Sequence, residues 1–136
     1  MKNVLILCTG NSCRSIMAEA LVNAKLGDFV QAFSSGIAAT GRVNPDAKKL
    51  LKRQELWRDD YYSKTIDELP DLPFDLVVTV CDHAKENCPV FPKVSARLHV
   101  SFEDPSGKAF NEYEKTLKQM QTLLLPQLQE QLGISN

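Results

Sequence analysis

A short segment near the start of the chain has the residue types that bind a tetrahedral oxyanion. Successive backbone N–H groups in a tight loop, followed by the N-terminus of a helix, form an anion-binding concavity. Gly10 and Asn11 tolerate the positive φ angles of such a loop, and the guanidinium of Arg14 can hold two oxygens at once. We therefore expect an oxyanion site built from this segment. Its members are Thr9, Gly10, Asn11, Ser12, Cys13 and Arg14.

Cys8 directly precedes this segment and is the expected nucleophile. The positive field that holds an oxyanion also lowers the pKa of a thiol, which predicts a Cys8 thiolate at neutral pH without a histidine base. The hydroxyl of Ser15 could donate a hydrogen bond to that sulfur. The alternative is a buried cysteine at a strand end followed by an ordinary turn. The position between a predicted strand and a predicted helix favours catalysis.

Hydrophobic periodicity predicts strands that alternate with helices. The expected strands cover residues 4–7, 29–33, 74–80 and 97–100. The expected helices run from Ser15, as the N-cap residue, to about Leu26, from Asn44-Pro45 onward, and over 111–132 with a kink at Pro126. This order indicates one α/β domain over residues 1–136, with a mainly parallel sheet and helices on both of its faces.

Three reactive groups follow the ends of predicted strands, and parallel strands end at one edge of a sheet. Cys8 and Cys81 each follow a strand, and Asp104 comes soon after the fourth. Asp104 could protonate a leaving oxygen, or the Asp104-Pro105 pair could simply form a turn. Adjacent strands lie about 4.8 Å apart, so Cys8 and Cys81 could form a disulfide if their strands are neighbours.

A second cysteine, Cys88, lies at the other end of the polar loop that begins at Cys81. Cys88 could attack a Cys8–Cys81 disulfide by thiol–disulfide exchange, provided that the loop rearranges. A zinc site and purely structural cysteines are the alternatives. Cys13 is expected only to pack as a small side chain.

The composition argues against several classes of partner. The 136 residues carry a net charge of −1 and no basic run, so neither nucleic acid nor an anionic membrane is an expected partner. The chain has no secretory signal and no apolar run of the roughly 18 residues that a membrane span needs. We therefore expect a cytoplasmic protein with reduced thiols, and neither a metal nor an organic cofactor.

The motifs closely resemble those of arsenate reductases built on the low-molecular-weight protein tyrosine phosphatase fold. The resemblance covers nearly the whole chain. It rests on residues 8–15 with Met17-Ala18-Glu19, on Ser34-Ser35-Gly36-Ile37, on Val43-Asn44-Pro45, on residues 75–81, on Asn87-Cys88-Pro89 and on residues 102–108.

The resemblance implies a four-stranded parallel sheet between helices and a disulfide cascade. Cys8 would attack arsenate, held by Arg14 and the loop amides, and Asp104 would protonate the departing oxygen. Cys81 would release arsenite by forming a disulfide with Cys8, and Cys88 would resolve it. Thioredoxin is the implied reductant of a monomeric enzyme, but Ile16 replaces a glutamine common among thioredoxin-coupled members, so glutaredoxin with glutathione is the alternative.

Some members of this family bind potassium beside the loop. The matching residues are Asn11, Glu19 and Ser34, together with an aspartate whose position aligns with Lys64 here. We therefore expect the Lys64 ammonium to replace the ion as structural support for the loop.

The main competing function is that of a low-molecular-weight protein tyrosine phosphatase, which would share Cys8, Arg14 and Asp104. The phosphatases usually have a tyrosine just after the Asp-Pro pair, where this chain has Ser106 and Gly107. They also have no use for Cys81 and Cys88. A non-enzymatic thiol sensor is a third possibility, which leaves the oxyanion loop unexplained. Weak phosphatase side activity is expected of the reductase.

Overall fold

The computed structural model describes residues 1–89, 94 and 96–134 of an α/β protein. Its elements, in chain order, are β1 (Lys2–Cys8), α1 (Arg14–Leu26), β2 (Val30–Gly36), α2 (Pro45–Arg53), the short 3₁₀ helix η1 (Ile66–Glu68), β3 (Leu76–Thr79), α3 (Asp82–Glu86), β4 (Arg97–His99), α4 (Phe110–Gln119), the π-helical segment η2 (Met120–Leu124) and α5 (Leu125–Leu132).

The four strands form one parallel sheet in the order β2-β1-β3-β4. The central strands β1 and β3 are buried on both faces, which is why their sequences are apolar runs without polar alternation. In register, Leu7 of β1 lies opposite Ser35 on one side and Thr79 on the other. The predicted neighbourhood of the strands that precede Cys8 and Cys81 is therefore confirmed.

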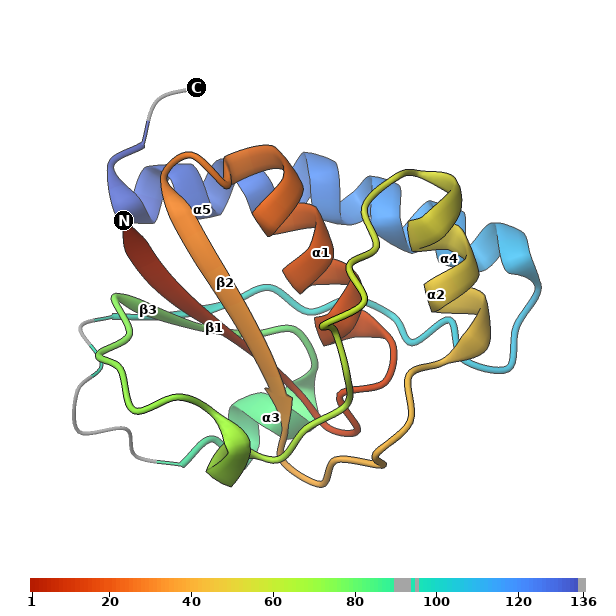
Figure 1. The fold of residues 1–136 in the computed structure, drawn as a ribbon, viewed down its shortest axis with the longest axis horizontal. Helices are drawn as coiled ribbons and strands as arrows, with labels where there is room; N and C mark the ends of the chain where they lie inside the picture. The colour runs from red at the N-terminus through yellow and green to blue at the C-terminus, as the bar shows by residue number, and fades with distance from the viewer. Residues whose placement is uncertain (90–93, 95, 135–136) are drawn as a thin grey trace.

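Helices cover both faces of the sheet, as predicted, but unequally (Figure 1). The Ser34 hydroxyl donates to Glu19 of α1, which places α1 on the face toward which the side chain of Ser34 points. Alternation along the strands directs Thr79 and His99 to the opposite face. In Figure 1, α1, α2, α4 and α5 lie together on one side of the sheet, and α3 and η1 lie on the other.

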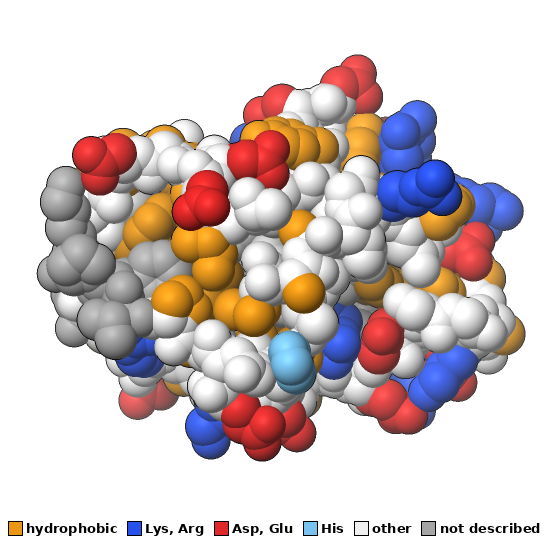
Figure 2. All heavy atoms as spheres, turned by 90° about the horizontal axis from the view of Figure 1, so that it is seen from below, with side chains coloured by type: hydrophobic (Ala, Val, Ile, Leu, Met, Phe, Trp, Pro, Cys, Tyr) orange, Lys and Arg blue, Asp and Glu red, His pale blue; other side chains and the backbone are white. Residues whose placement is uncertain are grey.

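The side covered by α3 and η1 is the more thinly covered one. Seen from below in Figure 2, apolar side chains reach the surface near the middle of this side, with acidic side chains toward its margins. Short elements cannot bury a whole sheet face, so apolar groups remain visible between them. Within the part of the chain that the structure describes, no helix has the length and apolar character needed to cross a membrane.

The main differences from the predicted elements concern α1, β2 and the stretch after Cys81. Helix α1 begins at Arg14 with Cys13 in the N-cap position, so Ser15 is buried in the first turn and does not cap the helix. Strand β2 continues through Ser34 to Gly36, because the ladder with β1 satisfies its backbone groups and Asn11 and Glu19 satisfy the Ser34 hydroxyl. The polar stretch after Cys81 contains the helix α3, which the sequence analysis treated as loop.

The predicted C-terminal helix is continuous from α4 to α5, with a change of pitch before the proline. Pro126 lies in the first turn of α5. A proline has no N–H and collides with the carbonyl four residues earlier, so the preceding turn widens. The amide of Leu125 accordingly donates to the carbonyl of Met120.

Candidate active site

The loop between β1 and α1 has its carbonyl groups turned outward. Each of four loop carbonyls accepts a hydrogen bond from an amide outside the loop. The bonds run from Ile37 to Cys8 (3.0 Å), from Ala38 to Thr9 (2.9 Å), from Thr40 to Gly10 (3.0 Å) and from Asn44 to Ser12 (2.8 Å). A trans peptide points its carbonyl and the following N–H in opposite directions, and the described chain has no cis peptide. The amides that follow these carbonyls therefore face the interior of the loop, as an oxyanion requires.

Asn11 fixes the shape of the loop from within. It has φ +48° and is fully buried, which agrees with the predicted positive φ, whereas Gly10 has no positive φ. Its side-chain amide donates to the hydroxyls of Ser15 (2.8 Å) and Ser34 (2.9 Å), and its carbonyl oxygen accepts from the backbone amide of Lys64 (2.8 Å). Asn11 thus ties the loop to α1, to β2 and to the segment before η1.

Glu19 and Lys64 form a buried ion pair behind Asn11. Their side chains are 7% and 10% exposed, and the Lys64 Nζ lies 4.0 Å from a Glu19 carboxylate oxygen. The ammonium also donates to the carbonyls of Ser34 (3.0 Å) and Tyr62 (3.1 Å), while the Ser34 hydroxyl donates to Glu19 (2.6 Å). Burial raises the pKa of Glu19 to about 7, although Lys64 and Ser34 lower it. The four predicted support residues are therefore one connected network.

Arg14 and Asp104 meet at the mouth of the loop. The guanidinium donates to the carbonyl of Phe102 (3.0 Å) and lies 3.7 Å from an Asp104 carboxylate oxygen. Burial raises the pKa of Asp104, but hydrogen bonds from Ser106 and the charges of Arg14 and Lys108 outweigh it, so the pKa of Asp104 is lowered. The predicted convergence of Asp104 with the loop is confirmed, and without a bound anion its carboxyl group is ionised.

Cys8 and Cys81 interact directly at the base of the site. The Cys8 thiol donates to the Cys81 sulfur, and this bond, with burial, raises the pKa of Cys8. The same bond, with further donors from the Thr9 hydroxyl (3.3 Å) and the Ala84 amide (3.4 Å), lowers the pKa of Cys81 to about 5. This hydrogen bond opposes the predicted Cys8 thiolate, which stays a prediction. It favours the negative charge on Cys81, because the Cys81 sulfur accepts the hydrogen bond that the Cys8 thiol donates.

Cys88 and Cys13 lie in different surroundings from this pair. Cys88 is partly exposed just beyond the end of α3, and its sulfur accepts a hydrogen bond from Arg97 (2.9 Å). Cys13 is buried, and its thiol donates to the sulfur of Met17 (3.7 Å). Burial, followed by the charge of Asp104, raises the pKa of Cys13 to about 12. Cys13 is therefore a packing thiol, as its position in the sequence indicated.

This arrangement, with a cysteine and an arginine on one loop and an aspartate facing them, can be compared with known proteins. The family model described as low molecular weight phosphotyrosine protein phosphatase matches residues 3–134. The chain belongs to this family. An arsenate reductase of Brevibacillus brevis is 43% identical over 114 residues, which are 84% of this chain and 84% of that protein.

Solved structures of the low-molecular-weight phosphatase family show the same fold. An arsenate reductase from Archaeoglobus fulgidus is 34% identical, with a TM-score of 0.73 over 88% of this chain and 93% of that one. A low-molecular-weight protein tyrosine phosphatase from T. tengcongensis is 28% identical, with a TM-score of 0.76 over 96% and 99%. The predicted fold, and the resemblance to arsenate reductases of this family, are confirmed.

Two contacts of this family member were not predicted from its sequence. The hydroxyl of Ser63 donates to the carbonyl of Gly10 (3.1 Å), which helps to hold that carbonyl outward. Arg97 donates to Cys88 from β4. Ser63 and Arg97 lie outside any motif, and their partners are distant in sequence, so no local pattern predicts these contacts. Gly36 is different, because a Cβ at that position would lie 2.6 Å from the Thr9 carbonyl oxygen, so the loop requires glycine there.

Proposed function

We propose that the chain reduces arsenate to arsenite, with Cys8 as nucleophile and with Cys81 and Cys88 as the thiols that supply the remaining chemistry. The main support is the parallel pairing of β1 with β3, which puts Cys8 and Cys81 at neighbouring strand ends beneath the oxyanion loop, where their sulfurs share a hydrogen bond. A phosphatase reaction needs only the first sulfur. A reductive step also requires a second sulfur beside the nucleophile, because two sulfurs must each give up one electron.

The substrate-binding groups are the inward-facing loop amides and the guanidinium of Arg14. A tetrahedral dianion would replace Phe102 and Asp104 as the partner of that guanidinium, which would raise the proton affinity of Asp104 at the moment of binding. The hydroxyl of Ser15 accepts from Asn11, so its own hydrogen points elsewhere. We assign that hydrogen to the Cys8 sulfur once the sulfur carries negative charge.

The first step joins sulfur to arsenic. The Cys8 sulfur attacks the arsenic of hydrogen arsenate, an As–O bond breaks, and the products are a Cys8–arsenic ester and water. Asp104 supplies the proton that the departing oxygen takes up, and the proton lost by Cys8 restores the balance. No electron has yet been transferred, which is why phosphate esters can undergo the same step.

The second and third steps transfer the electrons. The Cys81 thiolate attacks the Cys8 sulfur, the S–As bond breaks, and its electron pair reduces arsenic from the +5 to the +3 state as arsenite leaves. The Cys88 thiolate then attacks the Cys81 sulfur and releases Cys8. Cys81 and Cys88 are separated by α3, and the rise of a helix puts seven residues roughly 10 Å apart, beyond the ~6.8 Å limit of a disulfide. Helix α3 must therefore unwind.

An external dithiol must then reduce the Cys81–Cys88 disulfide. Thioredoxin is the proposed reductant, because the family resemblance implies it and because Cys88 is partly exposed near the surface. Glutaredoxin with glutathione is the alternative.

We further propose that Lys64 replaces the potassium ion of some family members. Its ammonium lies 4.0 Å from Glu19 and donates to the Ser34 carbonyl, so a cation already occupies the space between these groups. A second cation there would meet like charge at close range. Potassium should accordingly raise neither the activity nor the melting temperature above the values measured in sodium.

A coupled assay tests the proposed function. Arsenate should drive steady consumption of NADPH in the presence of thioredoxin and thioredoxin reductase, with the glutaredoxin system run in parallel. Cys88→Ser should stop repeated turnover but spare hydrolysis of p-nitrophenyl phosphate, whereas Cys8→Ser should abolish both. Phosphatase activity without any arsenate-dependent consumption by either system would instead identify a phosphatase.

A further inference from the structure

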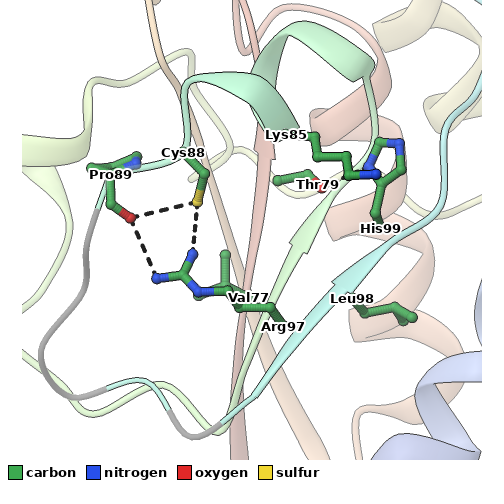
Figure 3. Close-up of a pocket in the computed structure, with 8 residues that line it drawn as sticks. All are labelled: Val77, Thr79, Lys85, Cys88, Pro89, Arg97, Leu98 and His99. Carbon is green, nitrogen blue, oxygen red and sulfur yellow. Dashed lines mark hydrogen bonds between the residues drawn. The ribbon is translucent and has the colours of Figure 1, made fainter.

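Strand β4 hydrogen-bonds both ends of the segment that separates Cys81 from Cys88. At the far end, Arg97 donates to the Cys88 sulfur (2.9 Å) and to the Pro89 carbonyl (3.4 Å), as Figure 3 shows. At the near end, His99 Nε2 lies 3.0 Å from a carboxylate oxygen of Asp82, the first residue of α3. Arg97 and His99 of one strand therefore contact the two ends of the segment that contains α3.

The ring of His99 is itself fixed from behind. Its Nδ1 lies 2.7 Å from the hydroxyl of Thr79, the residue paired with it in register on β3. A carboxylate can only accept, so Nε2 carries a hydrogen toward Asp82, and the Thr79 hydroxyl, which can donate or accept, pairs with Nδ1. Thr79 is buried in the sheet. The chain Thr79–His99–Asp82 thus ties the start of α3 to the rigid core.

The bonds of Arg97 to Cys88 and of His99 to Asp82 are made by the dithiol form of the protein. A Cys81–Cys88 disulfide requires α3 to unwind and the Cys88 sulfur to leave the Arg97 guanidinium. Interactions made only by the dithiol form stabilise that form relative to the disulfide, just as a ligand of one state shifts an equilibrium toward it. The bond from Arg97 is charged, and hydrogen bonds to charged groups are the stronger class.

A cavity of about 500 Å³ lies between β4 and α3. Its lining residues are Val77, Thr79, Lys85, Cys88, Pro89, Arg97, Leu98 and His99 (Figure 3). The groups that β4 holds therefore border open space. This space gives α3 room to rearrange, and the contacts from β4 are among those that keep the helix in place, together with its buried Ala84.

We propose that Arg97 and His99 are positioning residues that hold Cys88 and α3 apart from Cys81 in the reduced protein, and so set how readily the Cys81–Cys88 disulfide forms. This proposal rests on the proposed function, because it concerns the same relay. In the exchange, Cys88 thiolate attacks the Cys81 sulfur, the Cys8–Cys81 bond breaks, and Cys8 leaves as thiolate. Arg97 must release Cys88 before that attack.

The test is the redox equilibrium of the Cys81–Cys88 pair, measured without arsenate. A Cys8→Ser background removes the competing disulfide, and the protein is equilibrated with reduced and oxidised dithiothreitol and then thiol-trapped for mass spectrometry. Arg97→Met should shift the equilibrium constant about 10-fold or more toward the disulfide, the size expected for losing one charged hydrogen bond. A tenfold shift corresponds to a potential lower by about 30 mV. His99→Phe should shift the constant in the same direction.

Matched variants separate positioning from general loss of structure. Arg97→Lys keeps a cationic donor and should return most of the equilibrium toward the original value. Arg53→Met is the second control. Arg53 lies on α2 with its guanidinium over the Phe110 ring, far from this segment in the sequence, and its removal should leave the equilibrium unchanged. An equilibrium for Arg97→Met within twofold of the background, or displaced toward the dithiol, would overturn the positioning role alone. Failure of the background protein to form any Cys81–Cys88 disulfide would instead refute the proposed relay.

Discussion

The buried pair of Glu19 and Lys64 makes the stability of a Lys64→Met variant depend on pH in a defined direction. Burial raises the pKa of Glu19 to about 7 from its ordinary value of 4.5. A carboxyl group whose pKa is higher in the folded than in the unfolded chain loses stability as the pH rises between the two values. In the original protein this loss ends near pH 7. Without the ammonium the pKa of Glu19 rises further, so the variant continues to lose stability above pH 7.

The size of this effect follows from the contacts of the ammonium. Each pH unit between the old and the new pKa of Glu19 adds up to about 1.4 kcal/mol, or about 2 kcal/mol between pH 7 and pH 8.5. The two hydrogen bonds from Lys64 to the Ser34 and Tyr62 carbonyls add about 1 to 2 kcal/mol at either pH. We therefore expect Lys64→Met to lower the free energy of unfolding by about 1 to 2 kcal/mol at pH 6 and about 3 to 4 kcal/mol at pH 8.5.

Urea unfolding at pH 6 and pH 8.5 measures both values. Glu19→Gln and the double variant Lys64→Met with Glu19→Gln are the controls, because neither has a carboxyl group to ionise at position 19. The difference in unfolding free energy between these two should be the same at both pH values. Equal losses for the single variant at pH 6 and pH 8.5 would refute the reasoning, since they would mean that the ammonium does not stabilise an ionised Glu19.

Three further substitutions test the loop and its acid. Thr9→Val removes the hydroxyl 3.3 Å from the Cys81 sulfur and should raise the pKa of Cys81. Alkylation of Cys81 by iodoacetamide should then need a higher pH, whereas Thr9→Ser, which keeps the hydroxyl, should leave the pH profile unchanged. Asp104→Asn should lower kcat for p-nitrophenyl phosphate hydrolysis by about 100-fold or more, with little change in phosphate binding measured by calorimetry. Gly36→Ala places a Cβ 2.6 Å from the Thr9 carbonyl oxygen of the loop and should abolish phosphate binding. Gly41→Ala is its control, because a Cβ there meets open space at φ +79°, and it should lower only the free energy of unfolding, by about 1 kcal/mol.

Sequence reasoning placed most of the catalytic groups because their positions follow from topology. Cys8 and Cys81 follow strands that a parallel sheet must end at one edge, and the four-stranded sheet brings their sulfurs into contact. The loop between β1 and α1 was also predictable, since it follows a strand, precedes a helix and contains Asn11, a residue type that tolerates the positive φ found there. Local residue types and strand order were sufficient for these predictions.

The predictions that were wrong or incomplete depended on groups that are close only in three dimensions. The hydrogen bond that favours the negative charge on Cys81 over Cys8 joins residues distant in sequence, and no spacing in the sequence reveals it. Helix α3 was missed because the sulfur of Cys81 accepts the Ala84 amide at its N-terminus, and a thiol is not among the usual capping groups. Strand β2 continues through Ser34 because distant residues satisfy its hydroxyl.

The central claim is that two electrons pass from Cys8 and Cys81 to arsenic within one protein chain. The most direct test mixes reduced Cys88→Ser protein with excess arsenate in the absence of any external reductant, then quantifies arsenite and maps disulfides by mass spectrometry. The mechanism predicts one arsenite for each protein molecule and a Cys8–Cys81 disulfide in matching amount. Arsenite formation without that disulfide, or no arsenite from protein that still hydrolyses p-nitrophenyl phosphate, would contradict it.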